Sequence, residues 1–475
     1  MEKLKYNLSI LLLLTFAIST FGQSVPHMNK VVPAWSCDLL IVGGTVVTMD
    51  GDRHVYEDGA IAIKGDKIVK IGGRKYVTQS LTAKRTINAA GKVIIPGLIN
   101  AHTHVPMVLF RGIADDMDLQ EWLTKFIFPA EAKNVDEPFV RAGTRLGLAE
   151  MIRGGTTTFC DMYYFEDAIA DETKKAGMRA VLGETVLDFP APDNKSYADG
   201  LSYTARFIKK WQGDSLIVPA VAPHAPYTVS PEHLLEARDL SNKLNAPLVI
   251  HLAEANSETD FIQQKHKGMR PIEFVDSIGF LTNRTIAAHV IQANEHELDI
   301  LKARGVGIAH NPQSNMKLAA GVAPVPMMLS KDLAVGLGTD GAASNNDLSM
   351  WEEMDTAAKL HKLFSGDQKI VPAEQAFEMA TIRGARALHL DKIIGSLETG
   401  KRADIAIIDF DSIEMTPYYN LYSHLVYTTK ASDVRTVIIN GRVVMLDRRL
   451  LTLNENAIKK DARRYRGKII ESLKN

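Results

Sequence analysis

Eight short apolar runs, separated by stretches with helical periodicity, occupy the middle of this chain. The runs lack the alternating polar residues of a half-exposed strand, and this pattern is typical of strands buried on both faces of a parallel sheet. One intervening segment, SPEHLLEARDLSNKLN (230–245), has amphipathic helical spacing, and Ser230-Pro231 suits its first turn. Eight β–α repeats predict a (β/α)8 barrel over residues 97–390. We expect its strands within residues 93–104, 156–162, 179–184, 216–224, 247–254, 285–290, 306–312 and 334–340.

The two ends of the chain are predicted to build one small β-sandwich together. Residues 37–96 contain β-branched runs separated by Gly-rich turns, and residues 402–447 repeat this pattern, with INGR (439–442) as a hairpin signal. We assign residues 24–96 and 391–475 to this second domain. The length of 475 residues, 46% of them hydrophobic, is enough for a large core and a second unit.

The first residues predict a secretory signal peptide over residues 1–23. Lys3 and Lys5 precede an apolar run from Ile10 to Ile18, and small residues follow it. The run is short for a membrane span, and an uncleaved anchor is the alternative. We therefore expect an exported protein, periplasmic or secreted, that is soluble after cleavage.

Charge and cysteine content exclude several classes of protein. The net charge of −1 leaves no basic field for a nucleic-acid backbone. Two cysteines in so long a chain do not form a disulfide framework. Cys160 lies in the strand-like TTTFCDM and is expected to be a small core residue. We expect a small-molecule partner, with no nucleic acid and no membrane after signal cleavage.

Ionisable side chains follow the predicted strands at the points where they end. In a barrel, the carboxyl ends of all strands meet at one rim, and this rim is where function lies. A single histidine of this kind would be interpreted as a structural imidazole. Many of them at one predicted rim indicate a shared site. These residues are His102, His104, His224, His251, Glu254, His289 and Asp340.

Four of these residues form a donor set for a metal ion. His102 and His104 are two residues apart and point to the same face of a strand. With His251 and Asp340 they supply three nitrogens and one oxygen, which suits one Zn²⁺, with Fe²⁺ as the alternative. Such an ion lowers the pKa of a coordinated water toward ~7. The predicted fourth strand, SLIVPAVAPHAPYT, contains no lysine to bridge a second ion.

Proton transfer needs further groups near that water. Glu254 comes three residues after His251 and is the candidate general acid and base. Asp340 could accept the water's proton as well as bind the metal. His289 is expected either to orient the water or to pack behind the ligands.

These residues, in this order, resemble the amidohydrolase superfamily and, within it, the aminohydrolase branch. PGLINAHTH, HLAE, AAH and GTDGAASNN carry the resemblance, which extends from about Asp38 to about Leu446. The segments HTHVPMVLFRGIADDMDLQEWL, FPAE, APHAPYTVSPE, HNPQSNMKLAAGVAPV and LGTDGAASNNDLSMWEEM are similar to methylthioadenosine/S-adenosylhomocysteine deaminases, with triazine aminohydrolases and chlorohydrolases nearby.

The resemblance assigns roles to matching positions. It implies the four metal ligands named above, Glu254 as the catalytic acid and base, and His289 as the residue that orients the water. Glu254 and Asp340 would also contact the substrate. Three further contacts are implied: His224 in PHAP, Trp122 in EWL as the wall of the base pocket, and Glu131 in FPAE as the carboxylate that binds ribose hydroxyls. From its sequence context alone, Trp122 is equally a core aromatic.

The sequence departs from the resembling deaminases at two positions. An arginine that helps to hold the nucleoside is expected after the third strand, where this chain has Glu184. A second arginine, for the carboxylate of S-adenosylhomocysteine, has no clear equivalent, and Lys195 is the nearest basic residue. The departures disfavour S-adenosylhomocysteine more than they disfavour a simple purine nucleoside.

We therefore expect a metal-dependent hydrolytic deaminase of an amino-substituted heterocycle that releases ammonia. Adenine nucleosides are the first substrate class: adenosine, methylthioadenosine, 5′-deoxyadenosine or S-adenosylhomocysteine. One alternative is a triazine-type chlorohydrolase or another cyclic C–N hydrolase. An inactive periplasmic binding protein is the alternative from another class, and the complete set of ligands with Glu254 disfavours it. The resemblance also implies a homo-oligomer.

Overall fold

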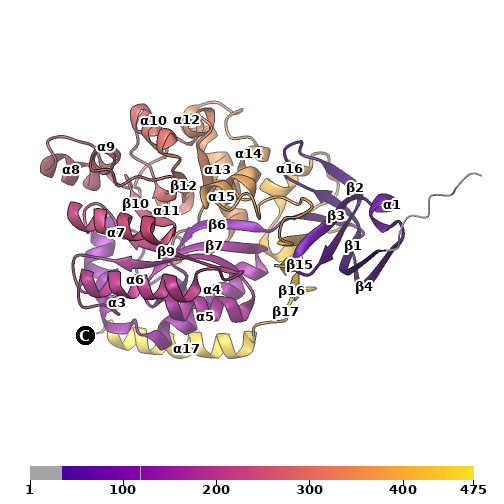
Figure 1. The fold of residues 1–475 in the computed structure, drawn as a ribbon, viewed down its shortest axis with the longest axis horizontal. Coiled ribbons are helices and arrows are strands. Elements are labelled where there is room, and N and C mark those ends of the chain that lie inside the picture. Colours follow the sequence, from indigo (N-terminus) through magenta and orange to yellow (C-terminus); the bar gives the residue numbers. More distant parts are fainter. Residues whose placement is uncertain (1–34, 118, 475) are drawn as a thin grey trace, which may run out of the picture.

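The computed structural model describes residues 35–117 and 119–474, which form an eight-stranded parallel barrel and a nine-stranded mixed sheet (Figure 1). The prediction of a barrel accompanied by a β-domain from both chain ends is confirmed. The signal peptide expected over residues 1–23 lies outside the described residues. No helix in the described part of the chain is long and apolar enough to cross a membrane.

The strands of the barrel follow one another around it in chain order, and β13 lies beside β6. Nearly all of their residues are buried, which explains the continuous apolar runs. The strands are β6 (Leu98–Thr103), β7 (Thr156–Tyr163), β8 (Arg179–Val186), β9 (Ile217–Pro223), β10 (Leu248–Leu252), β11 (Thr285–His289), β12 (Gly307–His310) and β13 (Ala334–Leu337).

The run at 93–104, expected to be one strand, is two strands in different sheets. β5 (Lys92–Pro96) belongs to the mixed sheet, and β6 begins at Leu98 in the barrel. The chain passes between the sheets at Gly97, where a Cβ atom would lie 2.1 Å from the side chain of Thr157. Only glycine fits so close an approach.

Helices surround the barrel between its strands (Figure 1). The helix predicted after Ser230 begins at Pro231, as expected. Asp136 caps the longest helix between two barrel strands by accepting a hydrogen bond from the Phe139 amide at 2.7 Å. The helices are α4 (Glu137–Arg153), α5 (Glu166–Ala176), α6 (Tyr197–Trp211), α7 (Pro231–Leu244), α8 (Asn256–Lys265), α9 (Pro271–Ser277), α10 (Glu295–Arg304), α11 (Pro312–Lys317), α12 (Val325–Ser330), α13 (Met350–Ser365), α14 (Ala373–Met379) and α15 (Ile382–Ala387).

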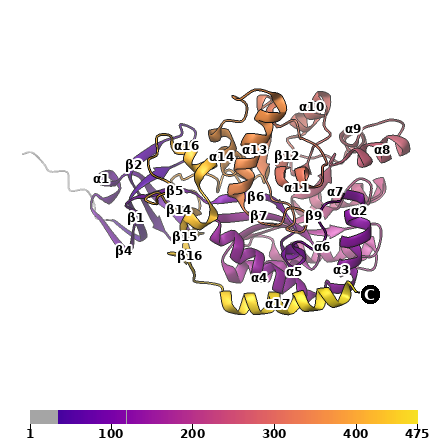
Figure 2. The same ribbon diagram turned by 180° about the vertical axis from the view of Figure 1, so that it is seen from behind.

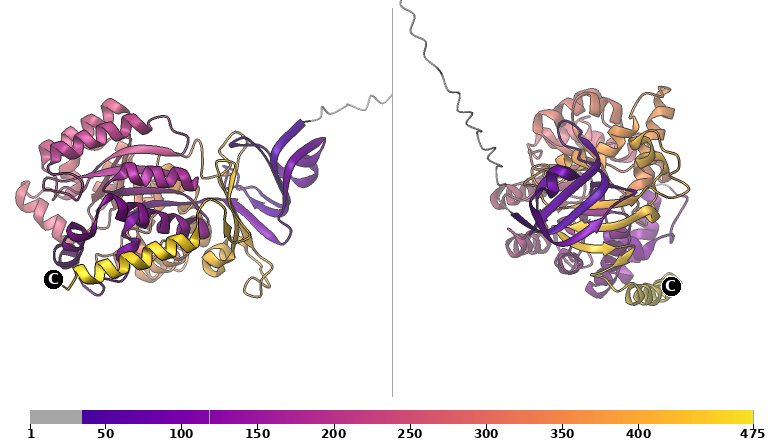
Figure 3. Two further views of the ribbon diagram at one scale, coloured as in Figure 1. Left: turned by 90° about the horizontal axis from the view of Figure 1, so that it is seen from below. Right: turned by 90° about the vertical axis from the view of Figure 1, so that its right-hand side faces the viewer.

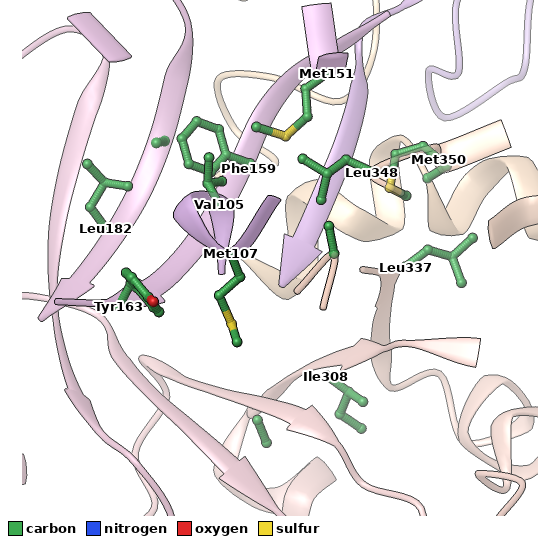
Figure 4. Close-up of a cluster of buried hydrophobic side chains, with 14 of the residues drawn as sticks. Val105, Met107, Met151, Phe159, Tyr163, Leu182, Ile308, Leu337, Leu348 and Met350 are labelled. Carbon is green, nitrogen blue, oxygen red and sulfur yellow. The ribbon is translucent and has the colours of Figure 1, made fainter. Parts of the chain in front are cut away.

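The segment between β6 and α4 contains several short helical turns. They are η1 (Val105–Phe110), α2 (Leu119–Glu121), η2 (Trp122–Ile127) and α3 (Phe128–Asn134). Figure 4 shows Val105 and Met107 of η1 in one apolar cluster with Phe159, Leu182 and Leu337 of the barrel strands β7, β8 and β13. This packing fixes the turn that directly follows His104.

The mixed sheet joins the two ends of the chain where β5 pairs with the antiparallel strand β14. The predicted hairpin at INGR connects β15 to β16 through Asn440 and Gly441, which both have positive φ. The remaining elements are β1 (Trp35–Val47), β2 (Val55–Lys64), β3 (Lys67–Gly73), α1 (Arg74–Thr78), β4 (Leu81–Asn88), β14 (Ile405–Asp409), α16 (Leu421–Ser423), η3 (His424–Thr428), η4 (Ala431–Asp433), β15 (Val434–Ile439), β16 (Arg442–Leu446) and β17 (Arg449–Leu450).

The final helix, α17 (Glu455–Ser472), packs on the barrel (Figures 2 and 3). It lies within residues 391–475, which the sequence assigned to the small β-domain. Its buried residues Ile458, Tyr465 and Ile469 face α3 and α4, and the Tyr465 ring lies 5.5 Å from that of Phe139. The segment thus returns from the mixed sheet to the barrel.

A buried ion pair joins the barrel to the mixed sheet. Arg179, at the start of β8, donates from Nε to Asp404 Oδ2 at 2.9 Å, and Asp404 also accepts from the Asn440 amide at 2.6 Å. The side chains are only 2% and 4% exposed. Removing one partner would leave the other charge buried and unpaired.

We therefore expect Arg179→Met to lower the free energy of unfolding by about 3 kcal/mol. Urea denaturation followed by circular dichroism measures the loss. The matched variant is Arg179→Met with Asp404→Asn, which also removes the unpaired charge and should recover part of the loss. Equal urea midpoints for the single variant and the wild type would show that the ion pair does not stabilise the junction.

Candidate active site

Three imidazoles and one carboxylate meet at the carboxyl ends of β6, β10 and β13. Asp340 Oδ1 lies 3.3 Å from His104 Nε2 and 3.6 Å from His102 Nε2. His104 Nε2 lies 3.3 Å from His251 Nε2. The structure therefore brings all four predicted metal ligands together, with ligand atoms from residues 102, 104 and 251 within 4.8 Å of one another.

These residues fit a divalent cation. His102 is fully buried, and among the described residues neither of its ring nitrogens has a hydrogen-bond partner. A buried polar atom without a partner is costly, and a bound ion would satisfy it. Three imidazole nitrogens with one carboxylate oxygen are a donor set that Zn²⁺ prefers.

Backbone carbonyls orient two of the imidazoles. His251 Nδ1 lies 2.9 Å from the carbonyl oxygen of His224, and His104 Nδ1 contacts that of Met162. A carbonyl only accepts, so each Nδ1 must carry the proton and each Nε2 is left to face the cluster.

Two serines hold the carboxylate of Asp340. Ser314 and Ser344 donate to Oδ2 at 2.6 and 3.0 Å, and the Gly341 amide donates to Oδ1 at 2.7 Å. Both serines lie in motifs noted above, HNPQSN and GAASNN, but the sequence analysis gave them no role. The bonds fix the carboxylate so that Oδ1 faces the histidines.

Burial and mutual charge set the protonation of the cluster. Burial lowers the pKa of His102 and His251, so both imidazoles favour the neutral form that a metal requires. Burial also lowers the pKa of His104, but the hydrogen bond to Asp340 outweighs it and raises the value to about 9. For Asp340, burial raises the pKa, but the bond from His104 and the nearby imidazoles outweigh it and hold the value well below its usual range.

Glu254 and His289 lie beside this cluster. Glu254 Oε1 is 3.7 Å from His289 Nε2, and burial raises the pKa of the carboxyl although His289 opposes the effect. His289 Nδ1 contacts Asn315 Oδ1 at 2.9 Å, and ligand atoms of His289, His102 and Asp340 lie within 4.8 Å of one another. His289 thus faces the cluster.

The backbone at His289 and Asp340 has φ of 72° and 60°, a strained conformation that is frequent at functional sites.

A pocket opens from the cluster. Trp122 of η2, Glu131 of α3 and His224 after β9 all line it, together with Glu254. The structure therefore places every predicted substrate contact in one pocket, which three of the predicted metal ligands, His104, His251 and Asp340, also line. Trp122 faces this pocket although it is only 7% exposed.

Glu131 is held by a tyrosine that the sequence analysis missed. The Tyr163 hydroxyl donates to Glu131 Oε1 at 2.7 Å, and both side chains are nearly fully buried. Burial raises the pKa of Glu131 to about 7, although the hydrogen bond from Tyr163 opposes the effect. Tyr163 could have been identified from the sequence, because it follows the predicted strand at 156–162 and the residues at strand ends are expected at the rim.

Glu184, at the position where an arginine was expected, does not line the pocket. It is fully buried in β8 and accepts hydrogen bonds from the Glu166 amide and from Asn194 Nδ2, both at 3.1 Å. Thr185, the next residue, lines the pocket. Neither Glu184 nor Lys195 is among the residues that line the pocket.

Comparisons with known proteins agree with this geometry. The amidohydrolase family model matches residues 93–444. A protein from Syntrophus aciditrophicus (strain SB), named 5-methylthioadenosine/S-adenosylhomocysteine deaminase 1, is 47% identical over 437 residues, which cover 92% of this chain and 98% of the relative. The resemblance stated from the motifs is confirmed.

Two solved structures are similar to this protein in fold. The crystal structure of an adenosine deaminase from Xanthomonas campestris with bound zinc has a TM-score of 0.91 at 37% identity, covering 92% of this chain and 100% of that one. A zinc-complexed atrazine chlorohydrolase from Arthrobacter aurescens TC1 has a TM-score of 0.84 at 23% identity, covering 90% and 99%. The second likeness shows the fold alone.

Proposed function

Because the chain belongs to the amidohydrolase family, we propose that it deaminates an adenine nucleoside by hydrolysis and releases ammonia. The observation that carries this proposal is one shared pocket. His104, His251 and Asp340 of the predicted metal ligands line it, together with Glu254 and the carboxylate of Glu131. The adenosine deaminase and methylthioadenosine deaminase relatives support the same substrate class.

The cluster His102, His104, His251 and Asp340 would hold one divalent cation, Zn²⁺ or, alternatively, Fe²⁺. When bound, such an ion acts as a Lewis acid and lowers the pKa of a coordinated water toward ~7. Asp340 Oδ1, anchored by its Oδ2 bonds to Ser314 and Ser344, is placed to accept a proton from that water. His289 Nε2 is placed to hold its oxygen.

Glu254 is placed to move protons between water and substrate. Water adds to the ring carbon that bears the exocyclic amine, and Glu254 delivers a proton to the adjacent ring nitrogen. The added hydroxyl gives up the second proton, which reaches the amine; the amine leaves as ammonia, and the ring keeps the oxygen as a carbonyl. Burial raises the pKa of Glu254, and this brings its two protonation states closer together near neutral pH.

The remaining contacts hold the nucleoside. Trp122 offers a flat apolar face to the base. The Glu131 carboxylate accepts hydrogen bonds from the two vicinal ribose hydroxyls, with the Tyr163 bond fixing its orientation. His224, whose Nδ1 lies 2.9 Å from Thr228 Oγ1, presents its other nitrogen to the pocket.

We expect the KM for adenosine to fall as the pH rises through about 7. Above this pH Glu131 is ionised and accepts from both hydroxyls, whereas below it the carboxyl is protonated. Glu131→Gln should remove this pH dependence and raise KM by about 10-fold to 100-fold, the effect of losing a charged hydrogen bond. Steady-state kinetics over about one and a half pH units on either side of this midpoint measure both effects.

The control for this prediction is 2′,3′-dideoxyadenosine, which lacks the hydroxyls but keeps the base. Its KM should show no such pH dependence with the wild-type protein. An equal pH dependence for both nucleosides would assign the titration to another group and contradict the role of Glu131.

Ammonia release by the zinc-loaded mature protein tests the proposed function. The panel contains adenosine, methylthioadenosine, 5′-deoxyadenosine, adenine, guanine, cytosine and aminotriazines, and chloride release from atrazine is measured in parallel. Turnover of nucleosides but not free bases supports the proposal. Activity only on free bases or triazines, or nucleoside binding without turnover, contradicts it.

We also propose that the protein is exported, to the periplasm or the medium, and forms a homo-oligomer. The basic residues Lys3 and Lys5 before the apolar run at 10–18 support export. The resemblance supports the oligomer. Mass spectrometry of the native protein should find an N-terminus after Gly22 or Gln23, and static light scattering gives the mass of the assembly. A retained Met1 in the cytoplasmic fraction would contradict export.

A further inference from the structure

We propose that the pocket selects nucleosides with an uncharged, apolar 5′ group and discriminates against those with a charged 5′ tail. Methylthioadenosine and 5′-deoxyadenosine belong to the first class, and S-adenosylhomocysteine, with its amino and carboxylate groups, belongs to the second. The inference rests on the proposed function and names the substrate within it.

Glu131 fixes where the 5′ group lies. With the base at Glu254 and the ribose hydroxyls at Glu131, the 5′ carbon is at the end of the ribose away from the base. On a helix, residues three and four positions apart are neighbours on one face. Phe128 and Ile127 precede Glu131 by three and four positions, and both line the pocket. The 5′ group therefore meets these two side chains.

The pocket has apolar lining residues besides its ionisable groups. We call Leu119, Leu123, Ile127, Phe128 and Leu318 the apolar wall, and all of them line the pocket. The Phe128 ring lies 6.1 Å from the ring of Phe189, which is 40% exposed. The apolar surface thus continues from Glu131 toward solvent. An alkylthio group would be buried against this surface without losing any hydrogen bond.

The pocket offers no lysine or arginine to a carboxylate. Among the described residues that line it, the ionisable ones are four histidines, three tyrosines, Glu131, Glu254 and Asp340. Two basic residues on adjacent segments have acidic partners. Lys125 donates to Glu121 at 2.9 Å, and Lys317 pairs with Asp115.

An anion beside the apolar wall would lose hydration without gaining a partner. Glu131 shows this cost of burying a carboxylate, because burial raises the pKa of its carboxyl to about 7 even with a hydrogen bond from Tyr163. A second carboxylate next to Glu131 would also be repelled by it. Both effects act against the tail of S-adenosylhomocysteine, and neither acts against a methylthio group.

The test compares kcat/KM of the zinc-loaded mature protein for four nucleosides. Methylthioadenosine and 5′-deoxyadenosine are the short apolar substrates. S-adenosylhomocysteine is the charged substrate, and 5′-butylthioadenosine is its uncharged match in length. We expect kcat/KM for each of the two apolar thioethers to exceed that for S-adenosylhomocysteine by about 30-fold or more. This is the effect expected when a charged group is buried without a partner.

Each outcome separates the inference from the function on which it rests. Equal kcat/KM for S-adenosylhomocysteine and methylthioadenosine overturns the inference and leaves the deaminase function intact. Poor turnover of both long thioethers overturns it too, because length and not charge would then decide. Absence of turnover for every nucleoside contradicts the proposed function itself.

A substitution in the apolar wall gives a second readout. Phe128→Lys introduces an ammonium group beside the 5′ position and should raise the ratio of kcat/KM for S-adenosylhomocysteine over methylthioadenosine by about 10-fold or more. Phe128→Met is the matched control and should keep the wild-type preference. An unchanged ratio in a folded, zinc-containing Phe128→Lys variant would overturn the placement of the 5′ group. If that variant does not fold, the comparison of four substrates with the wild type decides alone.

Discussion

Glu254→Gln should bind zinc and nucleoside but turn the nucleoside over about 10³-fold more slowly. The amide keeps the shape of the side chain but cannot carry a proton between the water and the ring nitrogen. None of the four predicted metal ligands is changed, so the metal content should equal that of the wild type. Single-turnover ammonia release measures the loss, and calorimetric titration with adenosine measures the binding that remains.

The matched control is Glu232→Gln, an exposed position in the first turn of α7. It makes the same chemical change far from the pocket and should leave kcat unchanged. A Glu254→Gln variant that retains more than about a tenth of wild-type kcat would show that another group transfers the proton, since general acid–base catalysis contributes at least 10²-fold. Such a result would point to Asp340 or His289.

His102→Ala should remove both the metal and the activity. Its imidazole is fully buried, and among the described residues its ring nitrogens have no partner apart from the ion that the cluster would hold. We expect less than about a tenth of one zinc per chain after dialysis, because a lost ligand costs more affinity than the 10-fold to 100-fold typical of an outer partner. Elemental analysis of the purified protein measures the zinc.

Thermal unfolding gives an independent readout of the same change. An ion that binds only the folded state stabilises it by ~2.7 kcal/mol at a concentration of 100 Kd. Added zinc should therefore raise the Tm of the wild type but not that of His102→Ala. His296→Ala, an exposed histidine in the first turn of α10, is the control and should respond as the wild type does. Full zinc content in His102→Ala would contradict the ligand assignment.

The atrazine chlorohydrolase shares this fold at 23% identity, and that likeness decides nothing about the reaction. The pocket is more informative, because Glu131 and Tyr163 present an oriented carboxylate that suits vicinal hydroxyls. A chlorotriazine has no such hydroxyls. The site therefore favours a nucleoside over a triazine.

The barrel was predictable from the sequence because strands buried on both faces must be continuous apolar runs. The same runs located the site, since the ends of parallel strands meet at one rim. We could list from the sequence HTH at the end of β6, HLAE within and after β10 and the Asp after β13, and they lie together in the structure. The prediction from local sequence was wrong at 93–104, because one apolar run there supplies strands to two different sheets. It also did not foresee that the final helix, α17, packs on the barrel.

The barrel, the ends of its strands and the residue types that gather there all follow from the order of residues along the chain. The partners of these residues follow only from the folded structure. Ser314 and Ser344 reach Asp340, Tyr163 reaches Glu131 from 32 positions away, and Glu184 turns from the pocket into the protein. The physical reason is that strand periodicity is a local property of the chain. A hydrogen bond between distant residues exists only after the barrel has closed and placed donor and acceptor about 3 Å apart.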